Sequence, residues 1–122
     1  MATSNGKLLF LQTGVTMQNC IVKNCGGTEI IVYFEGNGLM KDCLVEGCYS
    51  LGSDKTKFYA VRVCASATFK KINNVENVTF KNNKDGSSLH LYNYAEGNGR
   101  SYVKNCTFRS EEHTSELQSH LN

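Results

Sequence analysis

The sequence contains no proline, no tryptophan and no long apolar run. Its longest apolar stretch, residues 30–34, is far shorter than the roughly 20 residues that a membrane-spanning helix needs. Residues 1–14 contain only the short apolar run 8–11, too brief for the apolar core of about 7 to 15 residues in a secretory signal. We therefore expect no membrane-spanning helix in the given sequence, and either a cytosolic protein or a true N-terminus that lies upstream of residue 1.

A dense basic stripe interleaved with stacking aromatic residues is also missing. The 13 Lys and Arg residues are scattered among 11 Asp and Glu residues, and the formal net charge is only +2. A nucleic-acid interface normally concentrates its basic residues on one face. The sequence therefore predicts no nucleic-acid partner.

Asparagine and glycine are abundant, and they recur between short apolar runs. Both residues suit tight turns, because glycine accepts positive φ angles and asparagine tolerates the left-handed region. Short apolar runs separated by such turns favour strands over long helices. The composition therefore predicts an all-β fold.

The chain contains an internal repeat. Four segments align without gaps on the rule apolar, polar, Asn or Asp, small apolar, any, apolar; they are residues 17–25, 40–48, 75–83 and 103–108. A second apolar strand precedes each segment, at 7–11, 29–34, 57–63 and 89–94. The longest interval holds a polar insertion, residues 49–57, whose residues indicate no particular chemistry. Self-similarity at such spacing is typical of solenoids.

Each repeat has room for about three short strands and three turns, which is one coil of a solenoid. The recurring Asn or Asp suits a left-handed bend at a corner of the coil. Stacked coils would place equivalent residues about 4.8 Å apart. We expect two ladders: a turn ladder of Asn19, Asp42, Asn77 and Asn105, and an inward core ladder of Cys20, Cys43, Val78 and Cys106.

These segments resemble a known family. Residues 19–25, 77–83 and 105–108 resemble the coils of right-handed parallel β-helix proteins, the pectate-lyase-like superfamily. Residues 80–83 are also similar to the Phe-x-x-Asn repeat of polymorphic outer-membrane and autotransporter adhesins. The resemblance implies an all-β, right-handed parallel β-helix (β-solenoid) of about four coils, roughly 7–25, 26–48, 49–83 and 84–108, truncated at its C-terminal end. A leucine-rich repeat is the rival solenoid, but its leucine spacing does not fit.

Residues 109–122 do not continue the repeat. They resemble the translation of one reading frame of a common short-read sequencing adapter, so we expect a non-biological tail after a β-helix fragment at 1–108. A natural acidic amphipathic helix is the alternative. On the first interpretation the natural protein is longer than this chain.

The cysteines form two C-x4-C pairs, Cys20 with Cys25 and Cys43 with Cys48. A zinc site needs converging ligands, whereas the coil model separates the members of each pair between the core and the next corner. A Cys25–Cys48 disulfide is geometrically possible across one coil, and burial of cysteine as a small apolar residue is the leading interpretation. The sequence predicts no metal and no cofactor.

Alternation along residues 88–94 places Leu89 and Leu91 inside and the polar or aromatic residues between them outside. The same alternation, applied to the equivalent strands of the two preceding coils, places further aromatic and basic residues on the outside. The resulting candidate ligand-binding strip on the outer face comprises Tyr33, Phe58, Arg62, His90, Tyr92 and Tyr94. Such a strip could hold a sugar polymer, or its side chains could simply pair across strands and protect the sheet.

No catalytic residue is assigned. Pectate lyases of the resembled superfamily use clustered aspartates that hold calcium, with a basic residue as proton acceptor, and polygalacturonases use three aspartates with Gly-His-Gly and Arg-Ile-Lys motifs. Those motifs are absent, and the three aspartates, Asp42, Asp54 and Asp85, occupy separate turns. Whether the whole protein is an enzyme stays open.

Two function classes remain. The first is a non-catalytic structural or adhesive repeat segment of a secreted or cell-surface protein, with a polysaccharide or a host or cell-surface ligand as partner. The second is a fragment of a polysaccharide lyase or glycoside hydrolase whose catalytic coils lie elsewhere. The extracellular or cell-surface location is implied by the resemblance alone. In either class we expect the uncapped sheet edge after residue 108 to promote self-association.

Overall fold

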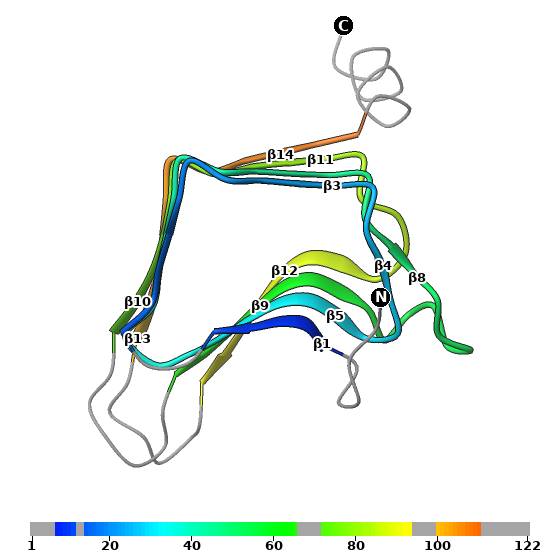
Figure 1. Ribbon diagram of the computed structural model, residues 1–122, viewed down its shortest axis with the longest axis horizontal. Helices are drawn as coiled ribbons and strands as arrows, with labels where there is room; N and C mark the ends of the chain where they lie inside the picture. Colours follow the sequence, from blue (N-terminus) through cyan, green and yellow to red (C-terminus); the bar gives the residue numbers. More distant parts are fainter. Residues whose placement is uncertain (1–6, 12–13, 66–71, 94–99, 111–122) are drawn as a thin grey trace, which may run out of the picture.

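The computed structural model describes residues 7–11, 14–65, 72–93 and 100–110, and within them every regular element is a β-strand (Figure 1). This confirms the all-β prediction. No helix in these ranges is long and apolar enough to cross a membrane. The strands are β1 (Lys7–Leu11), β2 (Thr16–Gln18), β3 (Ile21–Lys23), β4 (Gly26–Gly27), β5 (Ile30–Glu35), β6 (Leu39–Lys41), β7 (Leu44–Glu46), β8 (Tyr49–Ser50), β9 (Tyr59–Ala65), β10 (Ile72–Glu76), β11 (Thr79–Lys81), β12 (Ser87–Asn93), β13 (Arg100–Lys104) and β14 (Thr107–Arg109).

The strands form stacked parallel sheets. Three sheets have four strands each, in the orders β1-β5-β9-β12, β13-β10-β6-β2 and β14-β11-β7-β3, and β4 pairs with β8. Every neighbouring pair is parallel, because the chain returns to each sheet only after a full coil. Figure 1 looks along the stack, so that the strands of each sheet lie behind one another. The architecture is a parallel β-helix of about four coils.

The register reproduces the sequence repeat. Met17 pairs with Met40, Met40 with Val75, and Val75 with Val103, at separations of 23, 35 and 28 residues. These offsets are the same as those between Cys20, Cys43, Val78 and Cys106. A slip by one residue would turn the apolar side chains toward solvent, so their burial fixes the register.

The bend after the second strand of each coil uses the expected turn ladder. Asn19, Asp42, Asn77 and Asn105 have φ angles of 56°, 54°, 52° and 54°, all in the left-handed region. Asparagine and aspartate tolerate this region better than other side chains do. The bends are tied to the next coil, since the amide of Asp42 donates to the carbonyl of Glu76 at 3.1 Å and the amide of Asn77 to that of Lys104 at 2.9 Å.

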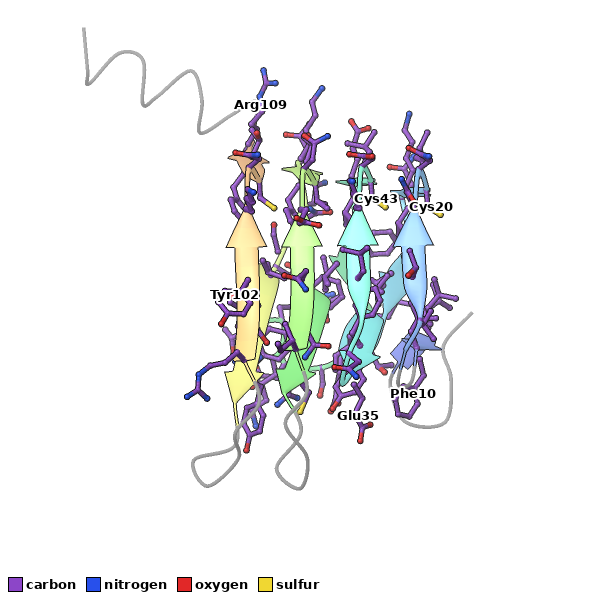
Figure 2. All side chains as sticks on the ribbon, turned by 90° about the vertical axis from the view of Figure 1, so that its left-hand side faces the viewer. Phe10, Cys20, Glu35, Cys43, Tyr102 and Arg109 are labelled. Carbon is purple, nitrogen blue, oxygen red and sulfur yellow. The ribbon has the colours of Figure 1, made fainter. Side chains whose placement is uncertain are left out.

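The core ladder lies beside that bend. Cys43 and Val78 are only 5% and 1% exposed, whereas Cys20 and Cys106 are partly buried and pack against the same core. The difference follows from position, because Cys20 and Cys106 belong to the first and last coils and have a neighbouring coil on one side. Figure 2 shows Cys20 and Cys43 at the same level of adjacent coils.

The segment 109–122 falls mostly outside the described residues. Arg109 ends β14 and pairs with Lys81 of β11, so the regular structure reaches one residue past the boundary predicted at 108. Residues 111–122 are not among those described, and the adapter interpretation of them stays a prediction.

Candidate functional site

The outer side of the β1-β5-β9-β12 sheet carries a group of aromatic and basic side chains. Parallel register places Tyr33 next to Arg62 and Arg62 next to His90 in successive coils. In Figure 1 the strands β5, β9 and β12 arch toward the inside of the coil. We call Tyr33, Tyr59, Arg62, His90 and Tyr92 the aromatic–arginine cluster.

Arg62 is the centre of this cluster. Its guanidinium carbon lies 4.8 Å from the ring centroid of Tyr92, 5.6 Å from that of Tyr59 and 6.0 Å from that of Tyr33. A cation within about 6 Å of an aromatic ring centroid is attracted to its electron-rich face. Three rings therefore hold one cation on the outer face of the sheet.

His90 extends the cluster to the fourth coil. Its ring stacks on Tyr59 with centroids 4.4 Å apart and an interplanar angle of 15°, and its centroid lies 6.3 Å from that of Tyr92. Burial, followed by the positive charge of Arg62, lowers the pKa of His90 below 6.5. The imidazole is therefore mainly neutral at pH 7, which suits a side chain packed beside a guanidinium.

Two buried nitrogen atoms of the cluster have no hydrogen-bond partner among the described residues: Nε of Arg62 and Nδ1 of His90. Desolvation of an unpaired polar group costs free energy. The contacts that these two side chains do make are the cation–π contacts of Arg62 and the stacking of His90 on Tyr59.

Tyr33 links the cluster to the first coil. The ring of Phe10 meets that of Tyr33 edge to face, with centroids 5.1 Å apart. Burial, and then the interaction with Cys64, raises the pKa of Tyr33 above its ordinary value, so the phenol keeps its proton. Phe10 itself remains partly exposed and continues the aromatic surface.

Sequence reasoning missed Phe10 and Tyr59. Phe10 pairs directly with Tyr33, so extending the outward count into the first repeat would have found it. No such signal exists for Tyr59, which lies an odd number of residues before Arg62 and would be counted as inward by strict alternation. Only the shape of β9 turns it outward.

The prediction that Phe58 faces outward was wrong. Phe58 is completely buried in the core. The reason is that Ala60 and Val61 are both buried, so the inward–outward alternation breaks between Phe58 and Arg62. As a result, the ring of Tyr59 points outward, and the ring of its neighbour Phe58 lies in the core.

Four candidates from the sequence thus lie together, namely Tyr33, Arg62, His90 and Tyr92, while Phe58 lies on the other side of the sheet. Tyr94 falls outside the described residues. The expected ligand-binding strip is therefore a cluster centred on Arg62.

A family model described as a right handed beta helix region matches residues 2–117 of the chain. The chain belongs to this family. The match confirms the predicted right-handed parallel β-helix and agrees with the coil register. No curated protein and no solved structure matches the chain significantly.

All six cysteines of this right-handed β-helix are free thiols. Cys25 and Cys48 are adjacent in register, because β4 pairs with β8 immediately after them, and no bond joins them. Burial raises the pKa of the Cys48 thiol to about 11. In the described ranges, no group of three or more His, Cys, Asp or Glu side chains converges as a metal site would require.

Proposed function

We propose that this right-handed β-helix is a non-catalytic structural or adhesive repeat segment of a secreted or cell-surface protein, and that its aromatic–arginine cluster binds polysaccharide. The observation that supports this proposal is that three tyrosine rings surround Arg62 on the outer face of a stacked sheet. The β-helix supplies the rigid scaffold, and the ligand contacts the side chains that point away from the core.

The chemistry of the cluster supports a sugar ligand. Aromatic rings offer flat apolar surfaces, and tyrosine adds a polar edge, so one residue can contact both the C–H face and a hydroxyl group of a sugar. Tyr92 is 38% exposed and Phe10 is 42% exposed, which leaves ring surface available near each end of the cluster. Repeated coils place such rings at regular intervals, and a polymer has repeating units to match them.

The experiment is a binding assay on cellulose, xylan, mannan and chitin. We expect at least one of these polymers to retain the chain, and the Tyr92→Ala variant to bind it about tenfold more weakly, equivalent to about 1.4 kcal/mol. Tyr102→Ala is the matched control, because Tyr102 is 53% exposed on the different sheet that contains β13. Figure 2 shows Tyr102 on that sheet.

Two results would overturn the proposal. One is retention by none of the four polymers, and the other is equal binding by the parent chain and Tyr92→Ala. Release of reducing ends or unsaturated products during the assay would instead support a fragment of a glycoside hydrolase or polysaccharide lyase.

A further inference from the structure

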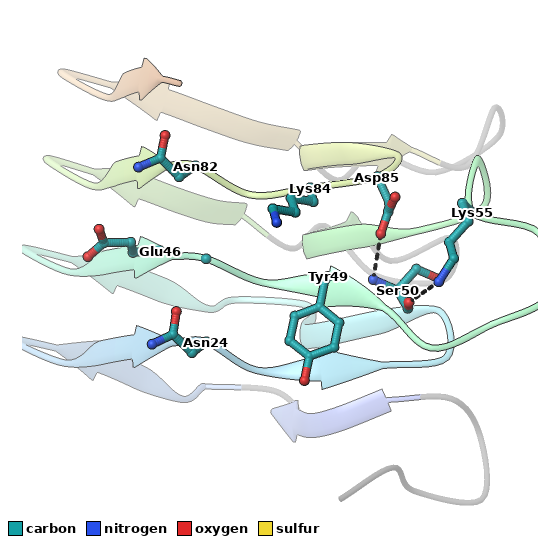
Figure 3. A pocket seen from close by; sticks show the side chains of 9 residues that line it. Asn24, Glu46, Tyr49, Ser50, Lys55, Asn82, Lys84 and Asp85 are labelled. Atoms are coloured by element: carbon teal, nitrogen blue, oxygen red, sulfur yellow. Dashed lines mark hydrogen bonds between the residues drawn. The ribbon is translucent and has the colours of Figure 1, made fainter. Parts of the chain in front are cut away.

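A second candidate site lies on another side of the coil. An open groove of about 670 Å³ crosses three coils (Figure 3). It lies at the corner where the β14-β11-β7-β3 sheet turns toward the β4-β8 pair, which Figure 1 shows. We call it the lateral groove. Its volume falls in the range of about 300 to 1,000 Å³ typical of small-ligand sites. Its lining comprises Asn24, Glu46, Gly47, Tyr49, Ser50, Lys55, Asn82, Lys84 and Asp85.

The second corner of the coil shapes the groove. Asn24, Gly47 and Asn82 occupy equivalent positions with φ angles of 54°, 69° and 52°. The middle residue has no side chain, and a Cβ atom on Gly47 would collide with Oδ1 of Asn24. The side-chain amide of Asn24 therefore occupies the space that a side chain at position 47 would need. Figure 3 shows Asn24 and Asn82 in neighbouring coils on either side of this position.

Tyr49 gives the groove an aromatic surface. It pairs in register with Gly26 of the preceding coil, and a Cβ atom on Gly26 would lie only 2.6 Å from Cε2 of Tyr49. The ring thus packs directly against the glycine backbone, which restricts its motion. It is nevertheless 39% exposed, so an ordered ring is available to a ligand at little further cost in side-chain entropy.

The polar side chains of the groove carry both signs of charge. Lys55 and Lys84 are matched by Glu46 and Asp85. At one end Ser50 fixes two of them: its backbone amide donates to Oδ2 of Asp85 at 3.0 Å, and its carbonyl accepts from Nζ of Lys55 at 2.6 Å. Glu46 lies toward the other end, with the amides of Asn24 and Asn82, and Lys84 lies between the two ends (Figure 3).

The equal numbers of positive and negative side chains in the groove favour a neutral ligand. Two ammonium groups and two carboxylates sum to no net charge, which gives no electrostatic preference for a strongly charged ligand. Hydroxyl groups both donate and accept, so one hydroxyl can bridge a carboxylate and an ammonium or amide. Clustered hydroxyls beside an apolar C–H face are the chemistry of a sugar ring, and Tyr49 supplies the surface for that face.

We infer that the lateral groove binds a neutral oligosaccharide, with one sugar ring stacked on Tyr49 and hydroxyl groups bonded to Lys84 and Glu46. This site is separate from the aromatic–arginine cluster and does not depend on the proposed function of that cluster. Tyr49 belongs only to the lateral groove and Tyr92 only to the aromatic–arginine cluster, so substitution of either residue tests one site alone.

The test uses cellohexaose, xylohexaose, mannohexaose and maltohexaose with the full chain, followed by backbone amide NMR. We expect one hexasaccharide to shift the resonances of Tyr49 and Lys84. Tyr49→Ala should weaken this binding about tenfold or more, while Tyr92→Ala should leave it unchanged. Tyr49→Phe should retain most of the affinity, because it keeps the ring.

Lys84→Gln is a second variant that should fold normally even if Tyr49→Ala does not. Lys84 is exposed, so its replacement removes no core contact. It should also weaken binding, with an unchanged unfolding midpoint. The inference is overturned if no hexasaccharide shifts Tyr49, if Lys84→Gln and Tyr49→Ala both bind like the parent chain, or if only an anionic saccharide such as oligogalacturonate binds there. Loss of polymer binding in Tyr92→Ala, with hexasaccharide shifts at Tyr49 intact, would show that the two sites act separately.

Discussion

Asn77 donates a hydrogen bond of 2.6 Å from Nδ2 to Oδ1 of Asp42, the equivalent residue of the preceding coil. The two residues are 35 positions apart in the chain, and both have left-handed φ angles. A local bend and a contact between coils therefore depend on the same side chains. The turn ladder stabilises the stack because each bend brings an amide or carboxylate to its neighbour.

The Asn77→Asp substitution tests the hydrogen bond between Asn77 and Asp42. It would place two carboxylates at hydrogen-bond distance, so we expect a loss of about 1 kcal/mol in the free energy of unfolding at pH 7. The loss should shrink at acidic pH, because protonation of one carboxylate removes the repulsion and restores a hydrogen-bond donor. Asn105→Asp is the matched control, because its neighbour in the preceding coil is Asn77. Urea unfolding that gives equal losses for both variants at pH 7 would contradict the prediction.

Gly86 approaches the backbone of the preceding coil. Its φ angle is +46°, and a Cβ atom there would overlap the carbonyl oxygen of Phe58. We expect Gly86→Ala to lower the free energy of unfolding by about 2 kcal/mol or more, from strain and displacement of the coil together. Gly14→Ala separates the two causes, since Gly14 also has positive φ, +81°, but nothing lies within 4 Å of its Cβ position. Thermal unfolding that shows similar losses at both sites would argue against close packing as the cause.

The pKa of His90 predicts a pH dependence. In the unfolded chain the imidazole takes up a proton near pH 6.5, whereas in the folded chain burial and Arg62 delay this to a lower pH. The unfolded state therefore binds more protons just below pH 6.5, and the stability falls as the pH drops through this window. His90→Gln should remove that part of the dependence. Denaturation at several pH values and NMR titration of the imidazole measure it, and titration of His90 at or above pH 6.5 would refute the prediction.

The last strands have open edges. Within the described residues β13 pairs only with β10, and β14 only with β11. Val103 is 40% exposed and Phe108 is 55% exposed, so apolar side chains lie beside strand edges that have no further partner strand among the described residues. We expect concentration-dependent self-association by light scattering, reduced by Val103→Lys and Phe108→Lys. Leu51→Lys, an exposed position outside the two edges, should not reduce it. A monomer at all concentrations would contradict this expectation.

The sequence predicted the coil and its register because the information is local and repeated. An asparagine or aspartate that tolerates positive φ marks each bend, and small apolar residues on either side mark the inside. Met17, Met40, Val75 and Val103 align in the sequence and pair in space for the same reason. Cys20, Cys43, Val78 and Cys106 likewise share one side of the coil, and the two in the middle coils are the more buried.

The candidate sites follow a different logic, because they combine residues from different coils and from strands whose alternation is irregular. Period-two counting brought Tyr33, Arg62, His90 and Tyr92 to one face, but it turned Phe58 the wrong way and missed Tyr59, since two successive buried residues in β9 interrupt the pattern. The one sequence signal for the lateral groove was the polar insertion 49–57, which supplies Tyr49, Ser50 and Lys55 but indicated no particular chemistry. The groove requires Tyr49 to pack on Gly26 of the preceding coil, and Ser50 to bond to Lys55 of its own segment and to Asp85 of the next coil. The amino-acid pattern by itself determined which way the chain bends and which residues stack. Only the tertiary structure decided which outward side chains meet, because those contacts depend on the local path of each strand and on the insertion between coils.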